Sequence, residues 1–136
     1  MAAPTEPVDQ AAEAGRLADL FNNLSQALDD FRLGDHIPPI TADESARLKD
    51  QAQELEGLSQ NFTAQAIGAT LQSIQPDLAN IKAVTAQATT QLGVLNDVSK
   101  VISIATSALT LGAAIAAGNP VSIAAAAEGL AQTIVA

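Results

Sequence analysis

Cysteine is absent from this 136-residue sequence, and histidine occurs only once, at position 36. Without cysteine the chain cannot form a disulfide, an iron–sulfur cluster, a thiolate-ligated zinc site or a thiol nucleophile. One histidine leaves few options for metal binding or general acid–base catalysis. Aromatic residues are scarce as well: the sequence has no tryptophan or tyrosine and only three phenylalanines.

Basic residues are also few. Six lysines and arginines stand against fifteen acidic residues, which gives a net charge of −9. A chain of this charge repels nucleic-acid phosphates and cannot gain affinity by releasing their counterions. Nucleic acid is therefore not an expected partner.

Recognisable catalytic motifs are missing as well. The sequence contains no phosphate-binding glycine loop, nucleophile elbow, calcium loop or zinc-binding His-Glu-x-x-His helix. His36 lies in a proline-rich stretch and is expected to be an exposed loop residue, and the acidic pairs 29–30 and 43–44 are expected to be solvated helix ends. The sequence thus predicts a protein that is not an enzyme and has no cofactor, metal or small-molecule substrate.

Alanine is what the chain has in abundance, with 29 residues, and 48% of all residues are apolar. This composition predicts an all-α fold, an antiparallel helical bundle formed by one domain over residues 9–136. Residues 1–8 are expected to be a disordered tail, and they lack the basic and apolar regions of a secretory signal. The compartment stays open between the cytoplasm, export by a signal-less route and association with a membrane.

Four helices are expected, over residues 9–33, 42–74, 76–117 and 121–136. Apolar residues at steps of three and four define the first, and Gly34 is expected to end it in a left-handed conformation. Pro38 and Pro39 cannot continue a helix, whereas Thr41 and Glu44 have the spacing of a capping box that starts the second.

The third helix would be about 60 Å long at 1.5 Å per residue and would project beyond a compact bundle. If Gly93 or Asn96 ended it early and Asp97 capped a new helix, a shorter five-helix bundle would result. A heptad pattern along this part of the chain predicts a packing seam. Its members are Leu71, Ile74, Leu78, Ile81, Ala88, Leu92 and Leu95.

Charge is divided unevenly between an acidic half, residues 9–74, and an apolar half, residues 76–136. Residues 1–56 carry a net charge of −8, whereas residues 57–136 carry only −1. Residues 101–136 resemble a helical hairpin with a turn at Gly118-Asn119-Pro120, and Glu128 is their one charged residue. With so few charges the hairpin has no ordinary solvated face. We therefore expect it to be covered by other helices or by lipid.

We expect this apolar C-terminal hairpin to associate with a second copy of the chain or with partner helices, while the acidic helices keep the protein soluble. The alternative within one chain is that the hairpin is simply the buried element of the bundle. The residues expected to form the contact surface are Val101, Ile102, Ile104, Ala108, Leu109, Leu111, Gly112, Ile115, Ala116, Val121, Ile123, Leu130 and Ile134.

Insertion of residues 101–136 into a lipid bilayer is the rival hypothesis. The segment resembles the uncharged hairpin that soluble α-helical pore-forming proteins hold at one end of a helical bundle, although here it is C-terminal and no helix returns after it. Ala108, Gly112 and Ala116 form a small-xxx-small row that would allow close helix packing in lipid or in a soluble bundle. A weaker hypothesis is an amphipathic helix over residues 81–98 that coats a lipid or polymer surface.

Overall fold

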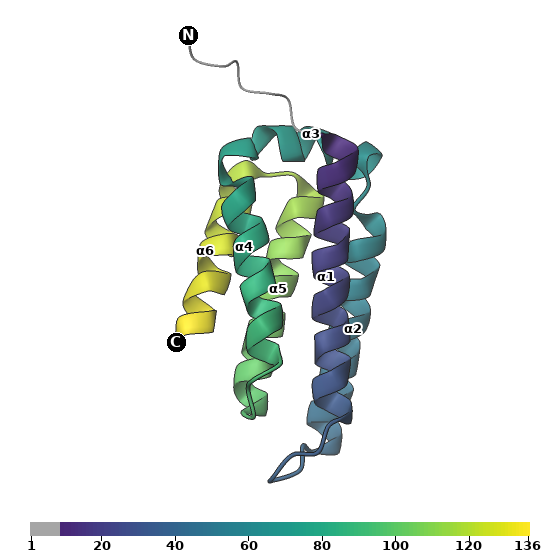
Figure 1. The fold of residues 1–136 in the computed structure, drawn as a ribbon, viewed down its shortest axis with the longest axis vertical. Helices are drawn as coiled ribbons and strands as arrows, with labels where there is room; N and C mark the ends of the chain where they lie inside the picture. Colours follow the sequence, from purple (N-terminus) through teal and green to yellow (C-terminus); the bar gives the residue numbers. More distant parts are fainter. Residues whose placement is uncertain (1–8) are drawn as a thin grey trace.

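A computed structural model describes residues 9–136, so the tail predicted for residues 1–8 lies outside the described part of the chain. The protein is all-α, and its helices pack as a bundle (Figure 1). The six helices are α1 (Gln10–Leu33), α2 (Ala42–Asn61), α3 (Ala64–Ser73), α4 (Gln75–Leu92), α5 (Val98–Ala117) and α6 (Pro120–Val135).

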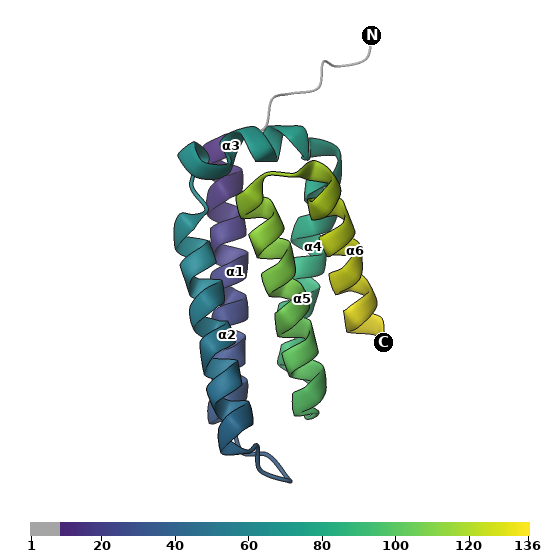
Figure 2. The same cartoon turned by 180° about the vertical axis from the view of Figure 1, so that it is seen from behind.

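Five of the helices run along the length of the bundle, and the short α3 crosses one end of it (Figure 1). Seen from behind, α2, α5 and α6 lie side by side with α5 in the middle (Figure 2). The turn between α5 and α6 lies at the end that α3 covers. The C-terminal pair therefore forms an apolar hairpin packed against the rest of the bundle, as the sequence predicts.

Side-chain caps explain where several helices begin. The carboxylate of Asp9 accepts from the Ala12 amide at the start of α1. Thr41 and Glu44 form the predicted capping box: the threonine hydroxyl accepts from the Glu44 amide, and the glutamate carboxylate accepts from the Thr41 amide. The end of α1 differs from expectation, because Gly34 is extended, with φ −76° and ψ 166°, and not left-handed.

The predicted helix over residues 42–74 is wrong in length, because the chain breaks at Phe62. The Phe62 side chain is only 3% exposed and meets the ring of Phe21 edge-on, with ring centroids 5.1 Å apart. Thr63 is extended, and its hydroxyl accepts from the Ala66 amide to start α3. Burial of an aromatic ring and a new cap together offset the helical hydrogen bonds lost at the break.

The long helix predicted over residues 76–117 does not exist. Helix α4 ends at Leu92, and α5 begins at Val98, where the carboxylate of Asp97 accepts from the Ser99 amide 3.0 Å away. This is the capped break that the sequence offered as the alternative. The two halves fold back on each other, so the bundle is compact where a projecting helix was expected.

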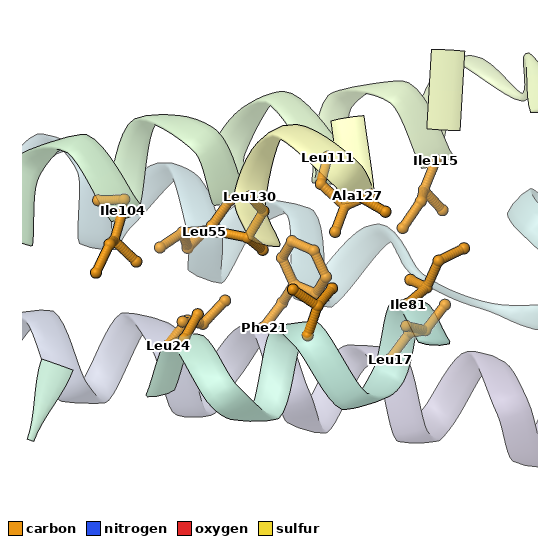
Figure 3. Packing of buried hydrophobic residues seen from close by; sticks show 14 of the residues in the cluster. Leu17, Phe21, Leu24, Leu55, Ile81, Ile104, Leu111, Ile115, Ala127 and Leu130 are labelled. Atoms are coloured by element: carbon orange, nitrogen blue, oxygen red, sulfur yellow. The ribbon is translucent and has the colours of Figure 1, made fainter. Parts of the chain in front are cut away.

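All six helices contribute to one hydrophobic core. Leu17, Phe21 and Leu24 point from α1 toward Leu111 of α5 and Leu130 of α6 (Figure 3). Each of these five side chains is fully buried. The hairpin is thus held to the acidic half of the chain by ordinary apolar packing.

Candidate interaction surface

The α5–α6 turn is fixed by local chemistry. Gly118 adopts a left-handed conformation, with φ 81°, and its amide donates to the carbonyls of Ala114 and Ile115. Asn119 then caps α6, because its side-chain oxygen accepts from the Val121 and Ser122 amides at 3.0 and 3.2 Å. Pro120 occupies the first turn, where its missing N–H costs nothing.

Two contacts tie α5 to α6 away from the turn. The hydroxyls of Ser107 and Thr133 lie 2.9 Å apart, and the Lys100 ammonium donates to the carbonyl of Ala136. The hairpin is consequently joined at both ends and in its middle.

Most of the large side chains predicted to form the contact surface face inward. Ile102 and Leu109 are partly buried, and only Ala116 and Val121 are exposed, Val121 to 79%. The remaining residues of the predicted surface are buried: Val101, Ile104, Ala108, Leu111, Gly112, Ile115, Ile123, Leu130 and Ile134.

The predicted heptad seam is likewise part of the core, although it is not one continuous helix face. The chain turns between its members at Ile74 and again after Leu92. Leu95 lies between helices and is partly buried. The other seam residues are buried: Leu71, Ile74, Leu78, Ile81, Ala88 and Leu92.

What the hairpin presents to solvent is a face of small and hydroxyl-bearing residues. Within α5 and α6, which the structure describes in full, Glu128 is the one charged residue among the exposed positions. We call these exposed positions the hairpin face: Ser99, Ser103, Thr106, Thr110, Ala113, Ala116 and Ala117 on α5, and Pro120, Val121, Ser122, Ala124, Ala125, Glu128, Gln132 and Val135 on α6.

Three exposed hydroxyls of α5 are already bonded within their own helix. Ser103 donates to the Ser99 carbonyl at 3.0 Å, Thr106 to that of Ile102 at 2.9 Å, and Thr110 to that of Thr106 at 3.0 Å. A hydroxyl that donates to the carbonyl four residues earlier has used its one proton. Covering this face therefore leaves no unpaired donor on these three side chains.

A groove of about 600 Å³ runs between α2 and α5. Its α2 wall consists of Glu54, Gly57, Leu58 and Asn61. Its α5 wall consists of Thr106, Leu109, Thr110 and Ala113.

A second groove, of about 390 Å³, lies between α5 and α6. Ser107 and Thr110 line it from α5, and Ala125, Ala126 and Gly129 are among its residues on α6. Since Thr110 lines both grooves, the exposed side of α5 is a ridge between them.

Beneath the larger groove the helices approach closely. A Cβ atom on Gly112 would lie 2.6 Å from Leu58 Cδ1 and 2.8 Å from Phe21 Cε2, so glycine is needed here. Gln51 of α2 crosses to α5 and donates to the Thr106 hydroxyl at 3.0 Å, while its own amide oxygen is buried without a hydrogen-bond partner. These contacts fix the spacing of the two groove walls.

His36 lies in the loop between α1 and α2, as the sequence predicts, but it is not the exposed residue that was expected. It is partly buried, its ring lies 4.1 Å from that of Phe31, and its Nε2 is 2.5 Å from the Phe31 carbonyl oxygen. The imidazole thus caps the end of α1. Over residues 9–136 no three histidine or carboxylate side chains gather as metal ligands would.

Of the residues that line the larger groove, sequence reasoning found Leu109 but missed Thr106, Thr110 and Ala113 on α5 and the whole α2 wall, including Gly57. The pattern that could have found the α5 residues is the spacing of Ser99, Ser103, Thr106 and Thr110, which places hydroxyls on one helical face opposite the large apolar residues.

Comparisons with protein-family models, with curated proteins and with solved structures found no match to this chain. By length and composition, α5 could cross a membrane, and 39% of its most apolar window is buried in the bundle.

Proposed function

We propose that this chain is a non-enzymatic assembly protein that associates with other helices through the hairpin face. The observation that carries the proposal is the contrast between this face, with Glu128 as its one exposed charge, and a chain whose net charge is −9. Desolvating a charged surface is costly, whereas small apolar groups and internally bonded hydroxyls can be covered at little cost. The two grooves beside α5 would let a helix approach closely.

Photo-crosslinking in the cells that produce the protein tests this proposal. Thr110→p-benzoylphenylalanine places a reactive group on the ridge of α5, and Asn23→p-benzoylphenylalanine places the same group on the exposed side of α1. We expect protein adducts at position 110 and not at position 23. Equal adducts at both positions, or none at either, would contradict the proposal.

A second candidate function is membrane insertion, favoured by the length and apolar composition of α5. The outward hydroxyls of Ser103, Thr106 and Thr110 are bonded to helix carbonyls, which lowers the cost of transferring them into lipid. Under this hypothesis α5 and α6 leave the bundle and enter the bilayer. Acidification should promote the step, because protonating carboxylates reduces repulsion from anionic lipid and removes the charge of Glu128.

Flotation with dye-loaded vesicles containing about 30% anionic lipid, at pH 7 and about pH 5, tests the membrane hypothesis. The informative variant is Ala113→Asp, because Ala113 is exposed and its replacement leaves the core intact, whereas Ala108 and Gly112 are buried. Asn23→Asp adds the same charge elsewhere. Dye release by the wild type and by Asn23→Asp, but not by Ala113→Asp, is the expected pattern; protein that never floats would exclude insertion.

A further inference from the structure

Three glycines in helix interiors have no contact within the chain that requires glycine: Gly15 on α1, Gly57 on α2 and Gly129 on α6. A Cβ atom added to Gly57 or to Gly129 would meet nothing within 4 Å. Glycine is among the least favourable residues inside a helix. Keeping it where a larger side chain would fit therefore lowers the stability of the isolated chain. Gly57 lines the larger groove and Gly129 the smaller one, on either side of the same α5 ridge.

The contrast with Gly112 is informative. There the missing side chain lets Leu58 and Phe21 of the same chain pack against α5. At Gly57 the missing side chain instead leaves the groove open to the outside. A groove of about 600 Å³ with small residues on its walls has room for the side chains of a second helix.

The shape of this surface is self-complementary. The ridge formed by Thr106, Thr110 and Ala113 is also one wall of the groove beside Gly57, and Figure 2 shows α5 between α2 and α6 on one side of the bundle. If a second copy faces the first about a twofold axis, each ridge enters the other copy's groove. Such a contact closes on itself and gives a dimer, not a fibre.

The distribution of charge also favours a second copy of the chain as the occupant of this groove. Two copies of a chain with net charge −9 repel each other over most of their surfaces, but Glu54 is the one charged residue lining either groove. A strongly basic partner would instead be drawn to residues 1–56, which carry a net charge of −8. The uncharged face is where like-charged copies can meet with least repulsion.

From these observations we infer that the groove between α2 and α5 receives the α5 ridge of a second copy, and that the chain forms a twofold-symmetric dimer. This inference rests on the proposed function and names its partner.

Sedimentation velocity of the purified full chain, over a wide concentration range, provides the test. Gly57→Met fills the groove with a flexible side chain and replaces glycine by a better helix former. We expect the wild type to dimerise and Gly57→Met to dimerise at least about tenfold more weakly while melting no lower. Gly15→Met is the control, because Gly15 is another helix-interior glycine with open space around it but lines neither groove.

Three outcomes would overturn the inference: a wild-type monomer at every concentration, a Gly57→Met variant that dimerises as well as the wild type, or loss of dimer only in Gly129→Met. Because the chain contains no cysteine, Thr110→Cys joined by a bis-maleimide linker gives a second measurement. Covalent dimer at position 110 but not in Asn23→Cys supports the contact, and equal yields contradict it.

The cellular photo-crosslinks separate this inference from the proposed function. Adducts at position 110 that contain a different protein, together with a monomeric purified chain, would overturn the dimer and leave helix-mediated assembly standing. Absence of any adduct at position 110 would overturn both.

Discussion

The ammonium of Lys82 on α4 lies 2.8 Å from a carboxylate oxygen of Glu13 on α1, joining residues 69 positions apart in the sequence. The Glu13 side chain is 14% exposed and that of Lys82 29%. The hydrogen bond from Lys82 lowers the pKa of Glu13 below its ordinary 4.5, with help from the charges of Lys82 and Arg16 and against the opposing effect of burial. The pair links the acidic half of the chain to the apolar half.

Glu13 should make stability depend on pH. Because its pKa is lower in the folded protein, its contribution is present above about pH 4.5, the value of the unfolded chain, and is lost as pH falls through the folded value. We expect Glu13→Gln to reduce the free energy of unfolding by about 1 kcal/mol at pH 7 and by almost nothing near pH 2. Urea denaturation at both pH values measures the difference, with Asp19→Asn as an exposed control on α1. An equal deficit at both would show that the effect is not electrostatic.

Helix starts with side-chain caps could be predicted from the sequence because their causes are local. Thr41 and Glu44 are three residues apart, and Asn119 precedes a proline, so each motif is visible in a few letters. The break at Phe62 has a weaker local signal, the single capping residue Thr63. The break also depends on Phe21, 41 positions earlier, which offers the surface on which the ring packs edge-on.

The candidate surface was predictable in composition but not in orientation. The shortage of charge in residues 101–136 indicates a face that something covers. Which side of α5 stays outside depends on how α1 and α2 pack against it, and the large residues such as Ile104 and Leu111 are taken by the core. The groove at Gly57 arises between helices distant in sequence, so no local pattern could reveal it.

Gly112 and Gly129 should respond oppositely to alanine. At Gly112 the new methyl group would lie 2.6 Å from Leu58 and 2.8 Å from the buried Phe21 ring, so the core must shift, and we expect a loss of about 1 to 3 kcal/mol. At Gly129 the methyl group meets nothing, and we expect a gain of up to about 1 kcal/mol from helix propensity. Thermal unfolding at a concentration where the protein is monomeric compares the two. A gain in Gly112→Ala would mean that α5 is not held closely against α1 and α2.

Gln51 offers a test of a buried polar contact. Replacement by leucine loses hydrogen bonds to the Thr106 hydroxyl at 3.0 Å and to the Ile102 carbonyl at 3.4 Å, together worth about 1 to 2 kcal/mol. It also removes a buried oxygen that has no partner, at a saving of about 1 to 3 kcal/mol. We therefore expect Gln51→Leu to be as stable as the wild type or more so. Gln51→Ala leaves a cavity between α2 and α5 and should be less stable than both. Urea unfolding of the three proteins decides between the outcomes. A leucine variant clearly less stable than the wild type would show that the Gln51 amide is better satisfied than its contacts indicate.

Substitution should be costly at Gly118, in the hairpin turn, and tolerated at Gly93, at the end of α4. Gly118 has φ 81°, where a Cβ atom is strained and would lie 3.1 Å from the Thr70 hydroxyl, so Gly118→Ala should cost about 1 to 2 kcal/mol. Gly93 ends α4 with φ −75° and ψ −17°, a conformation that alanine adopts readily, and its added Cβ makes only ordinary contacts. Gly93→Ala should therefore leave the free energy of unfolding within about 0.5 kcal/mol of the wild type. Hydrogen exchange, compared with the wild type, should be accelerated more in α6 of Gly118→Ala than in α1, because the strain is confined to the turn before α6. Equal acceleration across the bundle would mean that the hairpin opens only when the whole protein unfolds.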